Sequence, residues 1–137
     1  MELLTDEGME FVRDRHLATL STLLVDGSPH VVPVGFTFDG ETVRIITNGP
    51  SQKVLNVRRD PRASVSQLDG RRWLTLSGRA RILDDADSVA DAVARYAVRY
   101  RQPRENPLRV VIAIDVTRAM GSAGLVLPRS ERAPGSA

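Results

Sequence analysis

The sequence predicts a mainly β protein, a six-stranded antiparallel barrel with short helices. Most of the chain consists of alternating or β-branched runs, and Asp-Gly turn signals separate several of them. The 137 residues fit one domain, which we place at residues 1–127. The remaining segment, 128–137, has no apolar pattern, and we expect it to be a mobile tail.

The first predicted element is a short helix close to the N-terminus. Thr5 or Asp6 can cap it, because a side-chain oxygen at this position accepts a hydrogen bond from a free amide of the first turn. Met9 and Val12 are spaced for one buried face. We therefore expect the helix to run to about Arg15.

Three strands are predicted next, joined as an antiparallel meander. The runs are HLATLSTLLV, VVPVGFTF and TVRIIT, and each alternates or is rich in β-branched residues. Asp26-Gly27 and Asp39-Gly40 lie between them, and such pairs are typical of hairpin turns.

A second short helix follows the third strand. Asn48-Gly49-Pro50 ends that strand, and Ser51 can then cap a helix that runs to about Arg59. Asp60 precedes a proline, and a residue in that position avoids the helical region. The helix should therefore end there.

Two strands, a longer helix and a last strand complete the predicted barrel. RASVSQL and the run from Arg72 to about Leu83 flank the turn signal Asp69-Gly70. In the second of these strands the residues that alternate inward are Leu74, Leu76, Ala80 and Ile82. Asp84 or Asp85 can cap the helix, whose apolar stripe is Ala86, Val89, Ala90, Val93, Ala97 and Tyr100. The sixth strand is RVVIAIDVT.

The composition excludes several classes of function. There is no cysteine, and with His16 and His30 as the only histidines we expect no metal site. No apolar run approaches the roughly 18 residues that span a bilayer, so we expect a cytoplasmic protein without membrane contact. The basic residues other than Lys53 are arginines, and their clusters, one of which includes Arg99, suit a polyanionic small molecule. Six aromatic residues are too few for a typical nucleic-acid surface, and we expect no such partner.

The segment from Asn48 to Lys53 is the first candidate binding site. A strand, a tight turn and a helix N-terminus bring free backbone amides and the positive end of the helix dipole together, which suits a phosphate. Ser51 adds a hydroxyl and Lys53 an ammonium group within the first turn. The alternative interpretation is a serine-capped surface helix with a solvated lysine.

The second predicted strand and Trp73 are two further candidates. Pro33 and Gly35 interrupt the β pattern and leave a strip of low relief that a flat ligand could approach, although an edge strand with a bulge is the alternative. Alternation places Trp73 on the polar face of the fifth strand. It could stack on a ligand or on another subunit, or be covered by a helix of its own chain.

These segments resemble a known family. LATLST, DGSPHVVPVGF, VRIITNGPSQKVLNVRRDPRASVS and WLTLSGRA cover roughly residues 16–83 and are similar to the split β-barrel flavin and deazaflavin oxidoreductases related to pyridoxamine 5′-phosphate oxidase. RYAVRYRQPRENPLRVVI and GSAGL extend the resemblance to the branch that uses coenzyme F420, in particular its biliverdin reductases.

The resemblance implies a homodimer with a cofactor at each subunit interface. The family's phosphate contacts fall on Ser51 and Lys53, with Gln52 between them and Arg58 nearby. The strands that support the cofactor ring fall on Val32, Pro33 and Val34, beside Gly35, and on Ile46 and Thr47. The contact from the second subunit falls near Trp73.

The implied activity is hydride transfer from reduced F420 to biliverdin, or to a similar conjugated tetrapyrrole, giving bilirubin. An FMN-binding reductase on the same barrel and a non-catalytic carrier of F420 or a tetrapyrrole are the alternatives. Phe36 stands where members that oxidise pyridoxamine phosphate carry a basic residue, so that oxidation is not expected. The catalytic acid is not identified.

Overall fold

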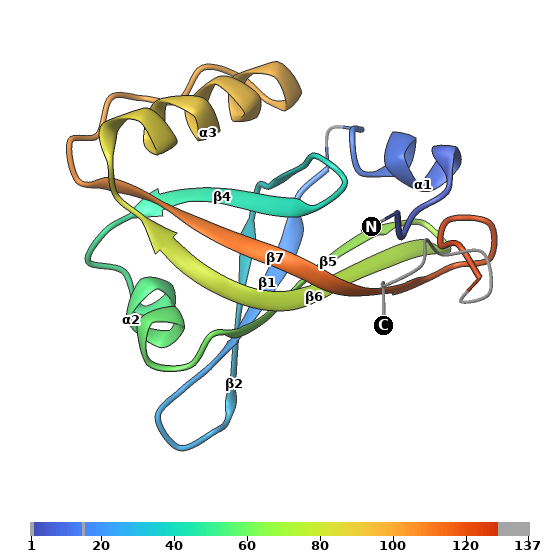
Figure 1. Ribbon diagram of the computed structural model, residues 1–137, viewed down its shortest axis with the longest axis horizontal. Helices are drawn as coiled ribbons and strands as arrows, with labels where there is room; N and C mark the ends of the chain where they lie inside the picture. The colour runs from blue at the N-terminus through green and yellow to red at the C-terminus, as the bar shows by residue number, and fades with distance from the viewer. Residues whose placement is uncertain (1, 15, 129–137) are drawn as a thin grey trace.

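The computed structural model describes residues 2–14 and 16–128, which form one curled antiparallel sheet with three helices (Figure 1). The strands are β1 Ala18–Leu23, β2 Pro29–Val34, β3 Thr37–Phe38, β4 Thr42–Asn48, β5 Arg62–Asp69, β6 Arg72–Leu83 and β7 Arg109–Gly121. Their order in the sheet is β2-β1-β5-β6-β7-β4-β3. The predicted fold class, mainly β with an antiparallel curled sheet, is confirmed.

The sheet has seven strands rather than the predicted six, because the run VVPVGFTF is divided after Val34. Its first part, β2, pairs with β1 at one edge of the sheet, and its second part, β3, pairs with β4 at the other edge. The link of Gly35 and Phe36 therefore joins the two edges and curls the sheet. Both predicted hairpins are present, β1 with β2 and β3 with β4. The prediction of one continuous meander is wrong, because the two hairpins lie at opposite edges of the sheet, where β1 continues to β5 and β4 to β7.

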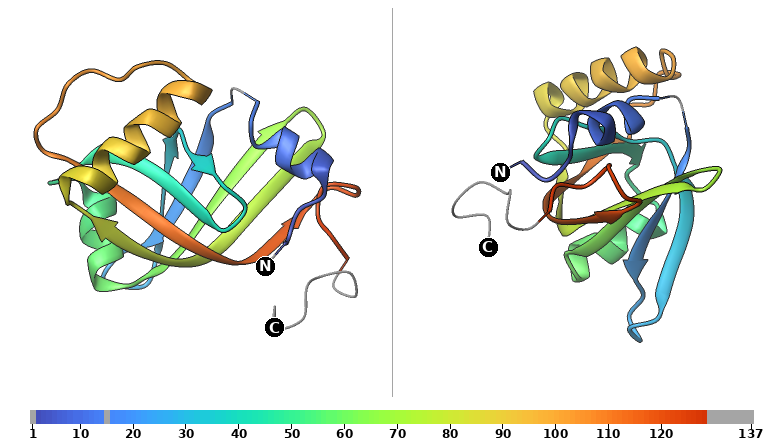
Figure 2. Two further views of the ribbon diagram at one scale, coloured as in Figure 1. Left: turned by 45° about the horizontal axis from the view of Figure 1, so that its top comes forward. Right: turned by 90° about the vertical axis from the view of Figure 1, so that its right-hand side faces the viewer.

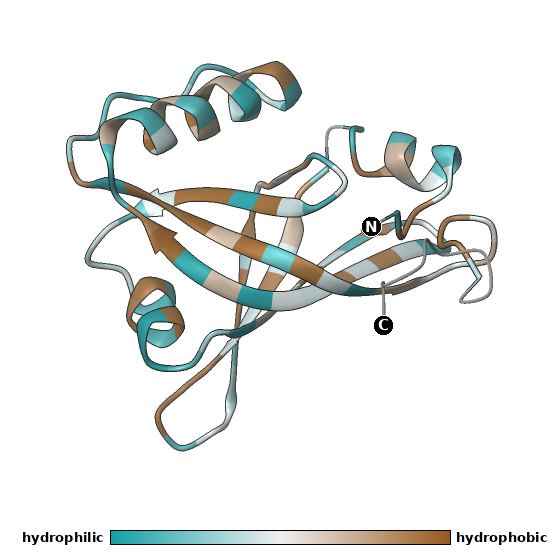
Figure 3. Cartoon of the chain, viewed as in Figure 1, coloured by the Kyte–Doolittle hydropathy of each residue, from teal (hydrophilic) through white to brown (hydrophobic). Residues whose placement is uncertain are grey.

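The inner face of the sheet forms the hydrophobic core, and β6 shows the predicted alternation (Figure 3). On β7 the inward positions are Ile112, Ile114 and Val116, and then Ala119. The inward positions change from even to odd residue numbers because the register contains a bulge. Ser77 pairs with Arg118 and Gly78 with Val116, so Thr117 is the extra residue.

The three helices are α1 Asp6–Phe11, α2 Gln52–Arg59 and α3 Ala86–Arg99. Thr5 caps α1 and Asp85 caps α3 through side-chain hydrogen bonds, as expected. Helix α1 ends at Phe11, earlier than expected, where the amide of Arg13 turns back to the carbonyl of Glu10. None of the helices in the described ranges is long and apolar enough to cross a membrane.

Helix α3 covers the outer face of β4 and β7, whereas α2 packs near β1 and β6 at one end of the sheet (Figure 2). Val111 and Ala113 lie on the outer face of β7, and both are fully buried beside Ala92 of α3. This two-sided burial explains why the β7 sequence is continuously apolar. Of the predicted tail 128–137, residues 129–137 lie outside the described residues.

Candidate functional site

The N-terminus of α2 has the features of an anion site. Ser51 is the N-cap residue and has an extended backbone, but its hydroxyl makes no cap hydrogen bond. The Oγ atom is buried and has no partner among the described residues. Because a buried hydroxyl without a partner is costly, the capped surface helix does not account for this serine.

Lys53 lies in the first turn of the same helix and is half-buried. Burial lowers the pKa of its ammonium group, since desolvation disfavours the charged form. Within the described ranges no carboxylate lies within ion-pair distance of it. We call Ser51, Lys53 and the free first-turn amides between them the α2 cradle, and a bound anion would satisfy all of these groups.

The other predicted residues of α2 are placed differently. The side-chain amide of Gln52 donates to Oδ1 of Asn56 at 2.8 Å, and Nδ2 of Asn56 donates to Thr22 on β1. Gln52 is thereby tied to the sheet. Sequence analysis missed Asn56, whose signal was a polar side chain on the buried side of a helix. Arg58 is exposed on the surface of α2.

Strand β4 leads directly into the cradle. Ile46 and Thr47 are half-buried and pair with Val111 and Val110 of β7. The turn that follows is held against the segment before β7, because the amide of Gly49 donates to the carbonyl of Leu108 at 2.8 Å. The end of β4 and the start of α2 are therefore fixed relative to each other.

Only part of the predicted ring-supporting strand is open to a ligand. Pro33 is exposed, Val32 is half-buried and Val34 is buried, as the alternation predicts. Gly35 does not extend an open strip, because a Cβ atom there would lie 3.1 Å from ring atoms of both Tyr96 and Tyr100. The surface open to a flat ligand is thus limited to β2 itself.

Trp73 lies at the other end of the sheet. It is 39% exposed and stands opposite Leu68 of β5, which is also exposed. No helix of the described part of the chain covers it. Figure 1 shows α2 near the last residues of β6, whereas Trp73 is the second residue of that strand, at its opposite end. One copy of the chain therefore does not bring Trp73 and the α2 cradle together.

Many of the clustered arginines are engaged within the protein. Arg81 pairs with Asp115, and Arg72 with Glu7. Arg59 donates to the carbonyl of Leu23. The guanidinium of Arg99 donates to backbone carbonyls and to the Gln67 side chain, so the expectation that this cluster is an anion patch is wrong for Arg99.

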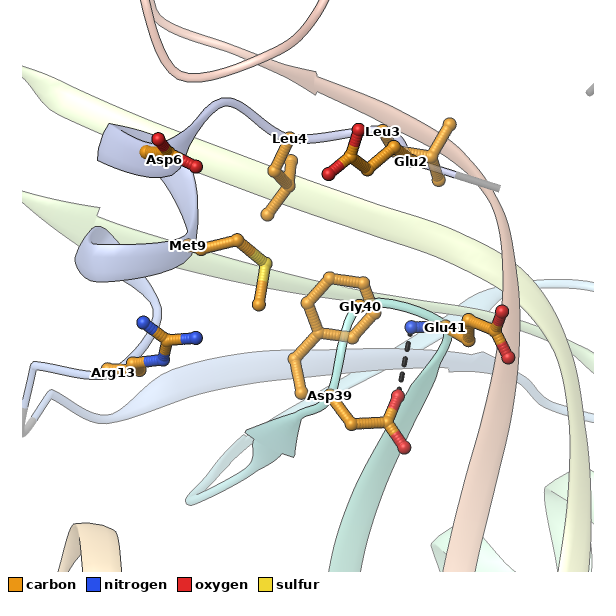
Figure 4. Close-up of a pocket in the computed structure, with 10 residues that line it drawn as sticks. Glu2, Leu3, Leu4, Asp6, Met9, Arg13, Asp39, Gly40 and Glu41 are labelled. Atoms are coloured by element: carbon orange, nitrogen blue, oxygen red, sulfur yellow. Dashed lines mark hydrogen bonds between the residues drawn. The ribbon is translucent and has the colours of Figure 1, made fainter. Parts of the chain in front are cut away.

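A pocket of about 500 Å³ lies between α1 and the β3–β4 turn, away from the predicted site (Figure 4). Its rim includes Glu2, Asp6 and Asp39, and Asp39 accepts a hydrogen bond from the amide of Glu41. Acidic groups of this kind do not suit an anionic cofactor. Residues 2–14 and 16–128 contain no group of side chains that could hold a metal ion.

The comparisons with known proteins agree with the geometry. A family model described as Pyridoxamine 5′-phosphate oxidase matches residues 4–121. The chain is 54% identical over 125 residues to the "F420H(2)-dependent biliverdin reductase" of Mycobacterium tuberculosis (strain CDC 1551 / Oshkosh), covering 90% of this chain and 91% of that protein.

Solved structures show the same fold. A conserved hypothetical protein from Mycobacterium tuberculosis matches with a TM-score of 0.75 and 26% identity, covering 96% of this chain and 92% of its own. A protein described as "F420 Reductase" matches with a TM-score of 0.69 and 26% identity, covering 81% of this chain and 94% of its own.

Proposed function

The chain belongs to the pyridoxamine 5′-phosphate oxidase family, and on that premise we propose that it is an F420-dependent oxidoreductase that reduces biliverdin to bilirubin. The relative that shares 54% of its residues carries this activity in its name. The observation in the structure that supports a bound phosphate cofactor is the buried, unpartnered hydroxyl of Ser51 beside the uncompensated charge of Lys53.

The residues present fit such a cofactor. The α2 cradle would hold the phosphate, with Ser51 donating its hydroxyl proton and Lys53 supplying a charge-assisted hydrogen bond. Ile46 and Thr47 would position the chain that leads into the cradle, and Pro33 with Val32 would support the ring. When bound, reduced F420 supplies the hydride. The protein's part is to orient the two reactants and to exclude water between them.

We also propose that the working form is a homodimer. Leu68, Trp73 and Met120 are large apolar side chains exposed on the outer face of β5, β6 and β7. Their register places them side by side, since Trp73 stands opposite Leu68 and Met120 stands opposite Thr75. A second copy would cover this patch and bring its own α2 cradle to Trp73.

FMN is the alternative cofactor, because its phosphate would fit the same cradle. A carrier that binds F420 or a tetrapyrrole without turnover is the alternative from another class. We keep residues 1–127 as the one cofactor-binding domain and the cytoplasm as the expected compartment. A tetrapyrrole other than biliverdin is the alternative substrate.

The test is a reaction of the purified protein with reduced F420 and biliverdin, in which oxidised F420 and bilirubin are separated by chromatography and each is then quantified. We expect both products to appear in equal amounts. Bilirubin formed only with reduced FMN would favour the alternative cofactor, and binding of both ligands without product would favour a carrier.

The dimer is tested by sedimentation of the wild type and of Trp73→Ala, with quenching of Trp73 fluorescence by F420. The wild type should sediment as a dimer, and F420 should quench the emission, since Trp73 is the only tryptophan. A monomeric wild type, or cofactor binding without quenching, would contradict the shared site.

A further inference from the structure

A pocket of about 330 Å³ lies between the end of α1, strand β3 and the last turns of α3, and we call it the α3 pocket. Its lining combines three apolar side chains, three arginines and one threonine. None of these residues belongs to α2 or to β2. Figure 1 shows α2 and α3 on opposite sides of β4. The α3 pocket is therefore separate from the α2 cradle and from the strand that we propose supports the ring.

The apolar part of the lining suits a small ligand body. Val12 and Phe38 are buried in the hydrophobic core and also line the pocket. Val98 lines it from α3, although its side chain is 90% exposed. An apolar group in the pocket would cover part of Val98, and removing that surface from water is favourable. The volume is at the small end of the range for ligand pockets, which fits a single ring or a short alkyl chain.

The polar part of the lining carries an excess of positive charge. It contains the guanidinium groups of Arg13, Arg95 and Arg99 and no acidic side chain. Nε of Arg95 lies 3.0 Å from Oδ2 of Asp91. For Arg13 and Arg99 no carboxylate of the described chain lies within ion-pair distance. The hydrogen bonds of Arg99 all go to neutral oxygens, so Arg99 adds charge to the pocket but is held by the protein.

Two buried groups in the wall of the pocket are costly without an anion. Burial lowers the pKa of Arg99, because desolvation disfavours the charged form, and a nearby carboxylate would offset that cost. The Oγ1 atom of Thr37 is buried and has no hydrogen-bond partner among the described residues. A rotation about χ1 would let this hydroxyl donate to a ligand oxygen.

We propose that the α3 pocket binds a small monocarboxylate with an apolar body, independently of the cofactor and of the tetrapyrrole. Of the three arginines, Arg13 alone makes no side-chain hydrogen bond within the described chain. Its exposed guanidinium can hold one carboxylate by two parallel hydrogen bonds. The apolar body then lies against Val12, Phe38 and Val98.

The first test uses three probes and the backbone amide resonances of the full chain. The probes are 4-phenylbutanoate, the neutral 4-phenylbutan-1-ol and acetate, and the resonances are those of Thr37, Val98 and Lys53. We expect 4-phenylbutanoate to shift Thr37 and Val98 and to leave Lys53 unchanged. The alcohol, which lacks the charge, and acetate, which lacks the apolar body, should each bind about tenfold or more weakly. Equal binding of the alcohol, or shifts confined to Lys53, would overturn the proposal.

The second test uses two pocket variants and a matched control. Arg13→Gln removes the free guanidinium, and Val98→Glu places a negative charge in the lining. The control Ala90→Glu adds the same charge at an exposed position of α3, eight residues before Val98 and about 12 Å away along the helix. We expect both pocket variants to fold and to bind 4-phenylbutanoate about tenfold to a hundredfold more weakly, and the control to bind as the wild type does. Wild-type affinity in both pocket variants, or an equal loss in the control, would contradict the proposal.

The third test shows whether the pocket is independent of the proposed function. The titration with 4-phenylbutanoate is repeated in the presence of saturating F420 and then of biliverdin. The shifts of Thr37 and Val98 should persist, because the pocket shares no residue with the α2 cradle. Displacement of the probe by either ligand would mean that the pocket belongs to the reaction site, which overturns the inference. Shifts in a protein that does not bind F420 would support the pocket and contradict the proposed function.

Discussion

The N-terminus of α2 and the C-terminus of α3 both gather hydroxyl and cationic side chains, but only the groups at α3 are satisfied by the protein. At α2 the hydroxyl of Ser51 has no partner and Lys53 has no counter-charge in the described chain. At α3 Arg99 and Tyr100 are fully engaged. The contrast separates residues that hold the fold from residues that we propose hold a ligand.

The α3 end works as a clamp on three distant segments. Arg99 donates to the carbonyls of Asp14 and Phe36 and to the Gln67 side chain. The hydroxyl of Tyr100 donates to the carbonyl of His16 at 2.7 Å. Burial raises the pKa of Tyr100 and lowers that of Arg99, yet every polar group finds a partner. These contacts hold the link between β2 and β3 that joins the sheet edges.

The largest expected effect is on the clamp. Arg99→Met removes hydrogen bonds from a charged donor and leaves the side-chain oxygen of the buried Gln67 and the carbonyl of Phe36 without this donor, so the free energy of unfolding should fall by about 3 kcal/mol. Urea denaturation measures it, with Arg101→Met as the control, since Arg101 is exposed. A loss no larger than that of the control would show that the clamp does not stabilise the fold.

A smaller effect is expected at Gly35. In Gly35→Ala the new Cβ atom meets the rings of Tyr96 and Tyr100 at 3.1 Å, and such overpacking costs about 1–3 kcal/mol. A double-mutant cycle with Tyr96→Ala should show coupling, because the two side chains compete for one space. Additive losses would mean that the strain lies elsewhere.

At the N-terminus of α2, by contrast, removal of the cationic side chain should not lower the free energy of unfolding. Lys53→Met removes a charge that burial disfavours, so the free energy of unfolding of the ligand-free protein should stay the same or rise by up to about 0.5 kcal/mol. Thermal denaturation measures it. A loss as large as that of Arg99→Met would place Lys53 among the structural residues.

The pH dependence of cofactor affinity sharpens the contrast. A bound phosphate raises the pKa of Lys53 above its value in the free protein, so affinity is fully present below the free-state pKa and is lost as pH rises through it. Because burial lowers that pKa, the fall begins at a lower pH than an ordinary lysine gives. Titrations at increasing pH should show this fall in the wild type. Lys53→Arg should abolish it, since arginine stays charged.

The sequence was sufficient for the strands and for the location of the α2 cradle, because both depend on neighbouring residues. The division of the run 31–38 was not predictable, since the tyrosines that cover Gly35 are more than 60 residues away in the chain. Arg99 was assigned to an anion patch for the same reason: its acceptors, such as the carbonyl of Asp14, are 85 residues away. The pattern of neighbouring residues in the sequence shows where polar side chains lie. Only the folded structure shows whether they have hydrogen-bond partners within the protein.

Sequence also placed Trp73 correctly on the outer face of β6, because alternation along a strand is local. Its distance from the α2 cradle depends on the course of the whole sheet. The pairing of Leu68 with Trp73, which makes the apolar patch, depends on the β5–β6 register. From sequence, the proposed dimer contact can be inferred only through the family resemblance.

The most direct test of the account is a calorimetric titration of F420 into the wild type and into Ser51→Ala/Lys53→Met, with Arg101→Met as the control. The account predicts that the double variant folds normally and binds F420 about tenfold to a hundredfold more weakly or worse, while the control binds as the wild type does. Wild-type affinity in a folded double variant would show that the unsatisfied end of α2 is not the cofactor site.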